Sequence, residues 1–302
     1  FDLQELQILS TLQFDALSGV NTINWIALPA LQALNFGHGV TKANTVYVSN
    51  TGLTDLRGIE LTAVGRMDIN NNQYLKTINV NNLGNVTESL SFSANGLNLE
   101  IEFPNLESAA NLTFRNVTSI SMPSLAEVAG SMGLYSNYFE SFAAPNLTRT
   151  GNTIAIIDSS ELTNVSFPLL ERVGGGLQLA NNSKLEDING FDALETIDGD
   201  INFYGSFDTI SFASISDVKG AANIYTSSGN GTICDLFNAA KKAQVIKGKV
   251  SCDANSELPE TGNGNGSSSD SSSSDNGAST LHFALSAPIT ALVAFVAGML
   301  FI

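Results

Sequence analysis

The sequence predicts an all-β fold, a right-handed parallel β-solenoid with a short helical C-terminal cap. Two observations favour it: a short apolar-x-apolar segment recurs at nearly constant spacing, and a second segment, often ending in Pro-x-Leu, recurs half a period later. A third is an asparagine that recurs just after the first segment. The chain has 302 residues, enough for one large domain or two small ones.

The first repeated segment is three residues long and apolar at both ends. Its last residue recurs at spacings of 22, 23, 21, 23, 22, 20, 22, 23, 24 and 21. Such segments are too short for helices, and their β-branched and aromatic residues favour strands. They are Phe1–Leu3, Ile23–Trp25, Val46–Val48, Met67–Ile69, Leu90–Phe92, Leu112–Phe114, Met132–Leu134, Ile154–Ile156, Leu177–Leu179, Ile201–Phe203 and Ala222–Ile224.

The second repeated segment ends at a corner of the chain. Proline lacks the N–H that a central strand donates, so its constant place just after the segment marks the end of a strand. The clearest copies are Ile101–Leu106, Ile120–Leu125 and Val165–Leu170, with looser copies at Phe142–Leu147 and Leu12–Leu17.

The recurring asparagine predicts an internal ladder. Asparagine tolerates turn conformations, and its amide can satisfy backbone groups in a tight bend. The alternative is that these are ordinary exposed turn residues. The predicted ladder consists of Asn50, Asn71, Asn95, Asn116, Asn137 and Asn182.

Stacking explains how such short strands form a core. One coil of this length cannot bury its apolar side alone, so successive coils stack and align equivalent strands in parallel sheets. We expect residues 1–228 to form about ten coils of ~22 residues each.

The segment 229–253 is predicted to cap the stack, because an open solenoid end exposes apolar core and unpaired strand edges. It is partly helical in pattern and contains the two cysteines, Cys234 and Cys252. In an oxidising compartment they would pair, with a stabilisation of roughly 3 kcal/mol. Two unrelated thiols and a small helical binding element are the alternatives.

The C-terminal end predicts a flexible linker and a lipid-anchor signal. Residues 254–276 are rich in Ser, Gly and Asn and cannot form a core. Small residues, a spacer and a terminal apolar run follow, which is the layout of a GPI signal whose tail, 277–302, is removed. Asn276 is the predicted attachment residue, with Gly277 and Ser274 as alternatives. A transmembrane helix is the rival, but the strict apolar run Ile289–Ile302 is short for a span.

Acceptor motifs for N-glycosylation are frequent, which agrees with secretion. They occur at Asn85, Asn111, Asn116, Asn146, Asn164, Asn181, Asn230 and Asn265.

Composition argues against several kinds of function. The net charge of −16 and the absence of a basic stripe exclude a nucleic-acid binder. With two histidines, His38 in a turn and His282 in the removable tail, we predict no metal, no cofactor and no catalytic residue. Trp25 alternates with Ile23 and is interpreted as core.

Two groups of carboxylates are candidates for a glycosidase pair, because parallel solenoids include polysaccharide-cleaving enzymes and glycoside hydrolysis uses two acids. No pair is distinguished by its setting. The two groups are Asp187, Asp192, Asp198, Asp200 and Asp208, and Glu100, Glu102 and Glu107.

The chain resembles a known family in the segments VYVSNTGLTDLRGIEL, NLTFRNVTSISMPSL, FESFAAPNLTRTGN and LTNVSFPLLERVGGGLQLANNSKLEDINGF. These are similar to fungal GPI-anchored cell-wall-organisation proteins, which carry a receptor-L-domain-like, leucine-rich-repeat-related solenoid and include sporulation-specific wall proteins. The resemblance implies a non-catalytic role in wall organisation, at the outer face of the plasma membrane or in the wall. It implies partners among wall polysaccharides or wall proteins, and a membrane contact through the lipid anchor.

Two other functions remain open at this point: a receptor-like ligand-binding module and a polysaccharide-active enzyme. Because the chain starts at Phe1 within repeat sequence, we also expect further coils and a secretion signal upstream.

Overall fold

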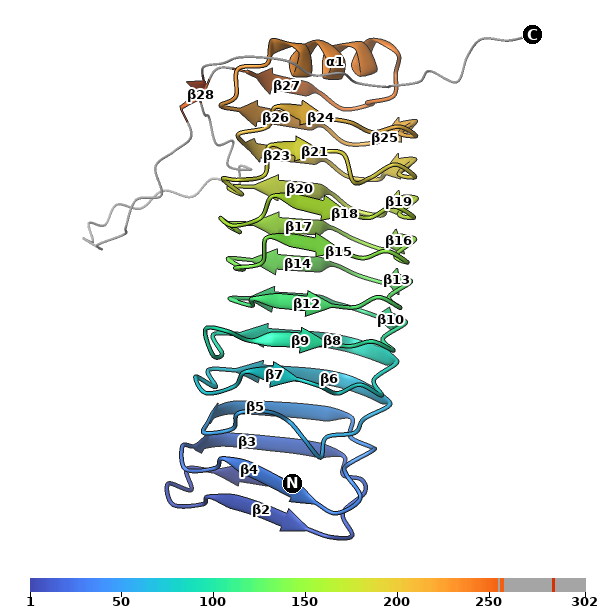
Figure 1. The fold of residues 1–302 in the computed structure, drawn as a ribbon. Coiled ribbons are helices and arrows are strands. Elements are labelled where there is room, and N and C mark those ends of the chain that lie inside the picture. Colours follow the sequence, from blue (N-terminus) through green and yellow to red (C-terminus); the bar gives the residue numbers. More distant parts are fainter. Residues whose placement is uncertain (255, 258–283, 286–302) are drawn as a thin grey trace, which may run out of the picture.

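The coils of the chain stack into one parallel β-solenoid, which confirms the predicted fold class. The structure is a computed structural model that describes residues 1–254, 256–257 and 284–285. Figure 1 shows the stack rising from the N-terminal coils to a single helix at the opposite end. All pairings among β1–β27 are parallel and link equivalent strands of successive coils.

The first strands of the coils form one long sheet. Each lies next to the equivalent strand of the following coil, so that Leu112 pairs with Leu90 on one side and Met132 on the other. The register shifts once in the β6–β8 pair, between Val64 and Arg66. These strands are β1 (Asp2–Gln4), β3 (Thr22–Leu28), β5 (Thr45–Thr51), β6 (Ala63–Asn70), β8 (Asn85–Ser93), β11 (Leu112–Arg115), β14 (Met132–Tyr135), β17 (Ile154–Ile157), β20 (Leu177–Ala180), β23 (Ile201–Gly205), β26 (Ala222–Thr226) and β27 (Val250–Asp253).

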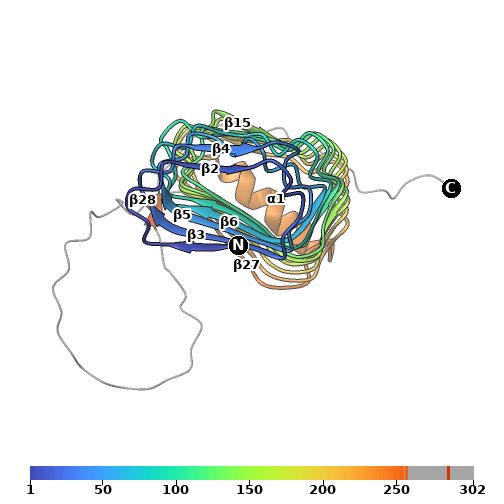
Figure 2. The same cartoon turned by 90° about the horizontal axis from the view of Figure 1, so that it is seen from below.

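A second set of strands lies on the opposite side of the coil, as the view along the axis in Figure 2 shows for β2 and β4. Pro-x-Leu turns follow several of these strands. The set consists of β2 (Thr11–Phe14), β4 (Ala33–Phe36), β7 (Thr77–Ile78), β9 (Glu100–Glu102), β12 (Ser119–Ser121), β15 (Ser141–Ala143), β18 (Asn164–Ser166), β21 (Asp187–Ile188) and β24 (Thr209–Ile210).

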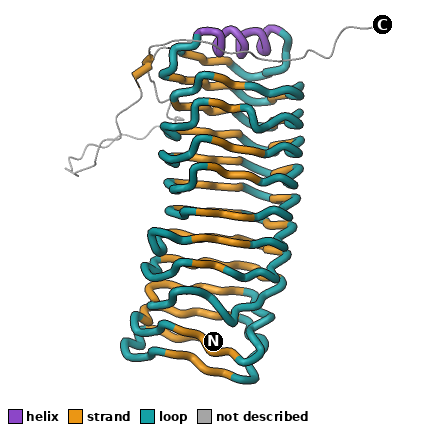
Figure 3. The backbone as a smooth tube through the Cα atoms, in the orientation of Figure 1, coloured by secondary structure: helices purple, strands orange, loops and turns teal. Residues whose placement is uncertain are grey.

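Two-residue strands form a third side, which leads back to the long sheet. From β11 onward a turn separates them from the next first strand, whereas β6 and β8 run through both segments without a break. They are β10 (Ser108–Ala109), β13 (Glu127–Val128), β16 (Arg149–Thr150), β19 (Arg172–Val173), β22 (Thr196–Ile197) and β25 (Asp217–Val218). Strands and loops alternate regularly along the stack (Figure 3).

The core runs the length of the stack because equivalent apolar side chains lie over one another. The Phe92 and Phe114 rings are stacked at 5.9 Å, and those of Phe167 and Phe191 at 5.1 Å. Trp25 is fully buried in this core. Each such aromatic side chain stabilises the fold by about 1.5–3 kcal/mol through removal of apolar surface from water.

The Pro-x-Leu segments form tight turns. The amide of Leu170 donates to the Phe167 carbonyl at 3.2 Å, with Pro168 in the second turn position, where its fixed φ fits. Leu125 donates to Met122 in the same way. The leucines of these turns are fully buried, so each proline turn directs the following leucine into the core.

The helix α1 (Gly231–Lys242) covers the C-terminal end of the stack. It buries Ile233 and Phe237, and the strand β27 that follows it pairs with β26. Cys234 and Cys252 form a disulfide with their Cα atoms 5.4 Å apart, which joins the helix to β27. Two further short strands, β28 (Ser256–Glu257) and β29 (Ala284–Leu285), pair antiparallel.

Candidate functional site

A row of buried polar side chains runs along the corner where the first strands end. From Asn72 onward, each side-chain oxygen accepts from a backbone N–H of the preceding coil: Asn72 Oδ1 from Thr51 at 3.0 Å, and Asn182 Oδ1 from Ser159 at 2.9 Å. Thr51 begins the row, and its hydroxyl donates to Asn72 Oδ1 at 2.7 Å. The asparagine amides also donate to a carbonyl of the preceding coil, as Asn182 does to Ile156 at 2.9 Å. The row contains Thr51, Asn72, Asn95, Asn137, Ser159 and Asn182.

The ladder prediction is wrong for Asn50, Asn71 and Asn116. These three occupy the preceding corner position, where the backbone φ is 55–58°, and their side chains are exposed or half-buried. Asparagine is one of the few L-residues that adopt this left-handed conformation at low cost. The left-handed residue changes the chain direction, so the following residue points inward. Asn95, Asn137 and Asn182 of the predicted set do lie in the buried row.

The acceptor asparagines differ in accessibility. Asn85, Asn111, Asn146, Asn164 and Asn181 are exposed, and Asn116 is half-buried. Several of their amides already donate one hydrogen bond, as Asn146 does to the Pro123 carbonyl at 2.7 Å. A substituted amide retains one N–H and can keep such a bond. Asn265 lies outside the described residues.

The structure contradicts the prediction of an acceptor at Asn230. Its side chain is fully buried and caps α1, accepting from the Thr232 amide at 3.1 Å and the Thr232 hydroxyl at 2.7 Å. Its Nδ2 donates to the Asp208 carbonyl at 3.1 Å. No space remains for a sugar on this nitrogen in the folded chain.

Several carboxylates of the acidic groups stabilise contacts between coils. Asp198 is bound by Arg172 from the preceding coil and by Lys219, whose Nζ lies 2.5 Å from Asp198 Oδ1. The hydrogen bond from Lys219 and the positive charges nearby outweigh burial and hold the pKa of Asp198 below its ordinary value. Asp187 accepts from the Thr209 hydroxyl. Asp192, Asp200, Glu100, Glu102 and Glu107 are exposed or half-buried on the surface.

The described residues hold no recognisable metal centre. His38 is exposed on its turn. In that same part of the chain, no three His, Cys, Asp or Glu side chains lie close enough to hold a metal ion.

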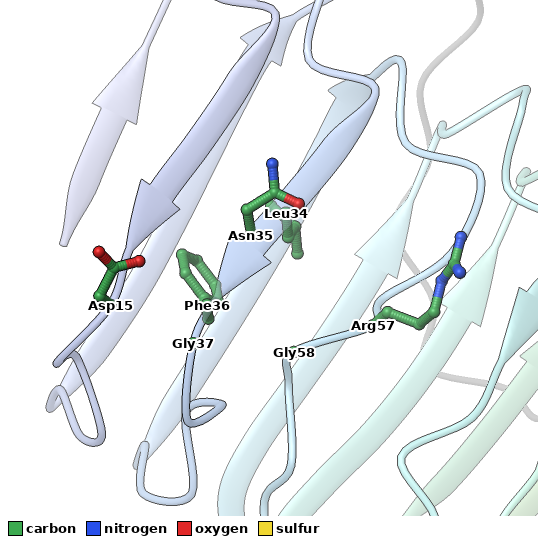
Figure 4. Close-up of a pocket in the computed structure, with 7 residues that line it drawn as sticks. All are labelled: Asp15, Leu34, Asn35, Phe36, Gly37, Arg57 and Gly58. Atoms are coloured by element: carbon green, nitrogen blue, oxygen red, sulfur yellow. The ribbon is translucent and has the colours of Figure 1, made fainter.

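A hollow of about 360 Å³ lies near the N-terminal end of the stack, between the ends of β2 and β4 and the next coil. Figure 4 shows Asp15 on one side of it and Arg57 on the other, with Phe36 between them. Arg57 binds Asp55 at 2.7 Å, and this hydrogen bond lowers the pKa of the Asp55 carboxyl. The hollow thus combines one acid with a guanidinium that already has a partner.

The predicted attachment residue Asn276, its alternatives Gly277 and Ser274, and nearly all of the linker and tail lie outside the described residues. No helix within the described range is long and apolar enough to span a bilayer.

Known proteins similar to the chain are fungal surface and wall proteins. The "cell surface GPI-anchored protein" of Arthroderma benhamiae is 42% identical over 270 residues, which cover 89% of this chain and 68% of that protein. "Protein ecm33" of Aspergillus fumigatus is also 42% identical, over 87% of this chain and 65% of its own length. "Sporulation-specific protein 2" of Saccharomyces cerevisiae is 32% identical over 83% of this chain, which spans 50% of that protein.

No family model matches the chain, and no solved structure matches it. The identity and coverage of the relatives, together with the solenoid, confirm the family indicated by the sequence. The chain belongs to the fungal family of GPI-anchored cell-surface and cell-wall proteins.

Proposed function

We propose that the chain is the solenoid part of a GPI-anchored glycoprotein that supports fungal cell wall organisation as a non-catalytic scaffold. The relatives named as GPI-anchored surface proteins or as wall proteins are the observation that carries this proposal. We place the protein at the outer face of the plasma membrane or in the wall, with wall polysaccharides or wall proteins as partners.

The outer face of the long sheet supports a scaffold role. Its central outward row is uncharged from β8 to β26, although the chain as a whole carries a net charge of −16. None of the eight acceptor asparagines falls in this row, so glycans attached elsewhere would leave its partly exposed members accessible, although Gly133 and Ala155 within it are buried. The row consists of Ser91, Thr113, Gly133, Ala155, Gln178, Asn202 and Asn223.

Rigidity is the physical property that such a scaffold needs. Each coil is held to the next by ladder hydrogen bonds, core stacking and cross-coil ion pairs such as Arg149 with Glu127 at 2.7 Å. In repeat architectures, neighbouring units stabilise one another along the stack. The result is a long surface of fixed spacing rather than an enclosed cleft.

Attachment is proposed at Asn276, with removal of residues 277–302. The test is release of the full-length protein from intact cells by phosphatidylinositol-specific phospholipase C or by β-glucanase. A truncation after residue 288 removes the apolar run and is expected to send the protein into the medium. The matched control, Asn265→Gln in the linker, should stay on the cell. Release by neither enzyme, or surface retention of the truncated protein, contradicts the anchor.

The scaffold role is tested by deleting the gene and measuring growth on a wall-binding dye. We expect the deletion strain to be hypersensitive and the wild-type protein to restore growth. His38→Ala, which removes the one histidine outside the proposed tail, should restore growth fully. Failure of His38→Ala to restore growth would argue for chemistry at that residue and against a purely structural role.

A further inference from the structure

A second hollow lies at the corner where β5 and β6 end. Its volume is about 370 Å³, within the range of small-molecule sites. Its lining residues come from successive coils and are Pro29, Asn50, Thr51, Asn71, Gln73, Tyr74 and Ala94. The scaffold role proposed above does not require any of these side chains.

The hollow arises from the corner residues themselves. Asn50, Asn71 and Ala94 occupy the left-handed position of three successive coils, with φ of 56°, 55° and 51°. The methyl group of Ala94 leaves space where the two coils before it carry an amide. Next to the hollow, Gly52 allows the close approach of the preceding coil, since a Cβ there would lie 2.7 Å from the carbonyl oxygen of Pro29, one of the lining residues. The shape is therefore built into the backbone.

Polar groups with hydrogen-bonding capacity to spare face this hollow. Asn50 Nδ2 donates to Ser49 Oγ and Asn71 Nδ2 to Asn70 Oδ1, both at 2.9 Å, which leaves one N–H on each amide. The side-chain oxygens of both residues, the Gln73 amide and the Tyr74 hydroxyl form no hydrogen bond with any residue that the structure describes. The hollow thus offers several donors and acceptors at once.

An aromatic ring forms its wall. Tyr74 is 54% exposed, so its ring is open to a ligand beside the amides. Two later coils carry Glu161 and Lys184 at the same corner position, and these two form an ion pair with each other. At this corner, the later coils therefore present a charged pair to solvent, whereas the earlier coils present the Tyr74 ring beside uncharged side-chain amides.

This chemistry fits an uncharged sugar. A pyranose ring has an apolar face of C–H groups, which packs on an aromatic face, and a rim of hydroxyls, which pair with amides. None of the lining side chains carries a charge, and the net charge of −16 disfavours an anionic ligand. A protein partner would need a buried patch of about 800 Å² on each side, far more than this hollow offers.

We propose that the hollow at Asn50, Asn71, Gln73 and Tyr74 binds a neutral hexose unit of a polysaccharide. The Tyr74 ring packs on the sugar face, and the three amides bind its hydroxyls. This inference rests on the proposed function at one point: the proposed wall location supplies the polysaccharide from which the sugar comes.

The test is a binding titration of the full-length protein, purified through an affinity tag from detergent-solubilised cells and freed of N-glycans by an endoglycosidase. The probes are a β-1,3-linked glucose hexasaccharide, an N-acetylglucosamine hexasaccharide and, as an acidic comparison, hexagalacturonate. We expect at least one neutral probe to bind and the acidic probe not to bind.

Variants then assign the binding to this hollow. Tyr74→Ala should weaken binding about tenfold, the loss expected for one aromatic contact, whereas Tyr74→Phe should retain it. Asn71→Gly removes an amide but keeps the left-handed backbone, and it should also weaken binding. The matched control is Lys184→Ala, at the same corner in a later coil, which should bind as wild type with an unchanged circular dichroism spectrum.

Three results would overturn the inference: no binding of either neutral probe, equal binding of hexagalacturonate, or full affinity in folded Tyr74→Ala. Failure here is distinguishable from failure of the proposed function. A protein that enzymes release from the cell surface, but that binds no neutral sugar, refutes this site and leaves the anchored scaffold intact.

Discussion

Replacing Asn72 by alanine tests the buried polar row at its most connected point. Asn72 is fully buried, and its Oδ1 accepts from the Thr51 amide at 3.0 Å and the Thr51 hydroxyl at 2.7 Å. Its Nδ2 donates to the Val48 carbonyl at 3.0 Å. The substitution therefore leaves two buried donors of the preceding coil, the Thr51 N–H and the Thr51 hydroxyl, without their acceptor.

The magnitude follows from these two groups. Each buried polar group that loses its partner costs about 1–3 kcal/mol, so the sum is about 2–6 kcal/mol, with about 4 kcal/mol as the central value. The assay is urea unfolding of the full-length protein, together with hydrogen exchange at the Thr51 amide. Exchange is needed because long repeat arrays can unfold in more than one step. We expect a lower midpoint and much faster Thr51 exchange.

The adjacent residue provides the control. Asn71 is exposed and has a left-handed backbone, so Asn71→Gly keeps the turn and removes only a surface amide. Its effect should stay within about 1 kcal/mol. Equal stability of Asn72→Ala and Asn71→Gly, with slow Thr51 exchange in both, would refute the ladder.

Three further predictions follow from the cap, the acceptors and the ion pairs. Replacing Cys234 and Cys252 by alanine should destabilise the cap by about 3 kcal/mol, which would be measured as faster hydrogen exchange of the α1 amides. Unchanged exchange would contradict a stabilising role of the disulfide. Mass spectrometry of peptides should find no glycan at Asn230, and an occupied Asn230 in folded protein would contradict its buried position. The pKa of the Asp198 carboxyl is lower in the folded state than in the unfolded state. The ionised carboxylate therefore contributes to the free energy of unfolding, by at most about 1 kcal/mol at this surface. This contribution is present above about pH 4 and is lost as the pH falls through the lowered pKa. Asp198→Asn should therefore flatten the acid limb of the stability–pH curve, and an unchanged limb would show that the pairing with Lys219 has no energetic effect.

The sequence predicts the strands better than the corners. Alternation of apolar residues identifies the inward side chains of each first strand, because a strand has a strict period of two. Both Leu112 and Phe114 are accordingly buried, with Thr113 facing out between them. The Pro-x-Leu turns are equally local, since proline fixes its own φ and cannot continue the ladder.

The prediction failed at the corners because a residue with a left-handed backbone interrupts the two-residue alternation of inward and outward side chains. Asn71 and Asn72 are identical in type and adjacent, and one faces solvent while the other is buried. Asparagine suits both positions, for a backbone reason at one and a hydrogen-bonding reason at the other. Ser159 of the same row gives no sequence signal of its own, because its hydroxyl acts only through the neighbouring coils.

The candidate sites could not be predicted from local sequence either, because their contacts join residues of different coils. An Asn-x-Thr motif marks Asn230 in the sequence, and only the packing of α1 on the last coils reveals that its amide caps the helix. The hollow at Tyr74 combines side chains from coils that are about 22 residues apart in sequence, so no local motif identifies it.

Distances between spin labels test the stacking of the coils most directly. Asn24, Ser91 and Asn223 lie in one outward row, with Asn223 nine strand steps from Asn24 and six from Ser91. At about 4.8 Å per step, the backbone separations are about 43 Å and about 29 Å. Labels introduced as non-natural amino acids, which keep the disulfide, should give two narrow distributions in that ratio. Broad distributions, or a shorter distance for the pair with more steps between its members, would contradict a single continuous stack.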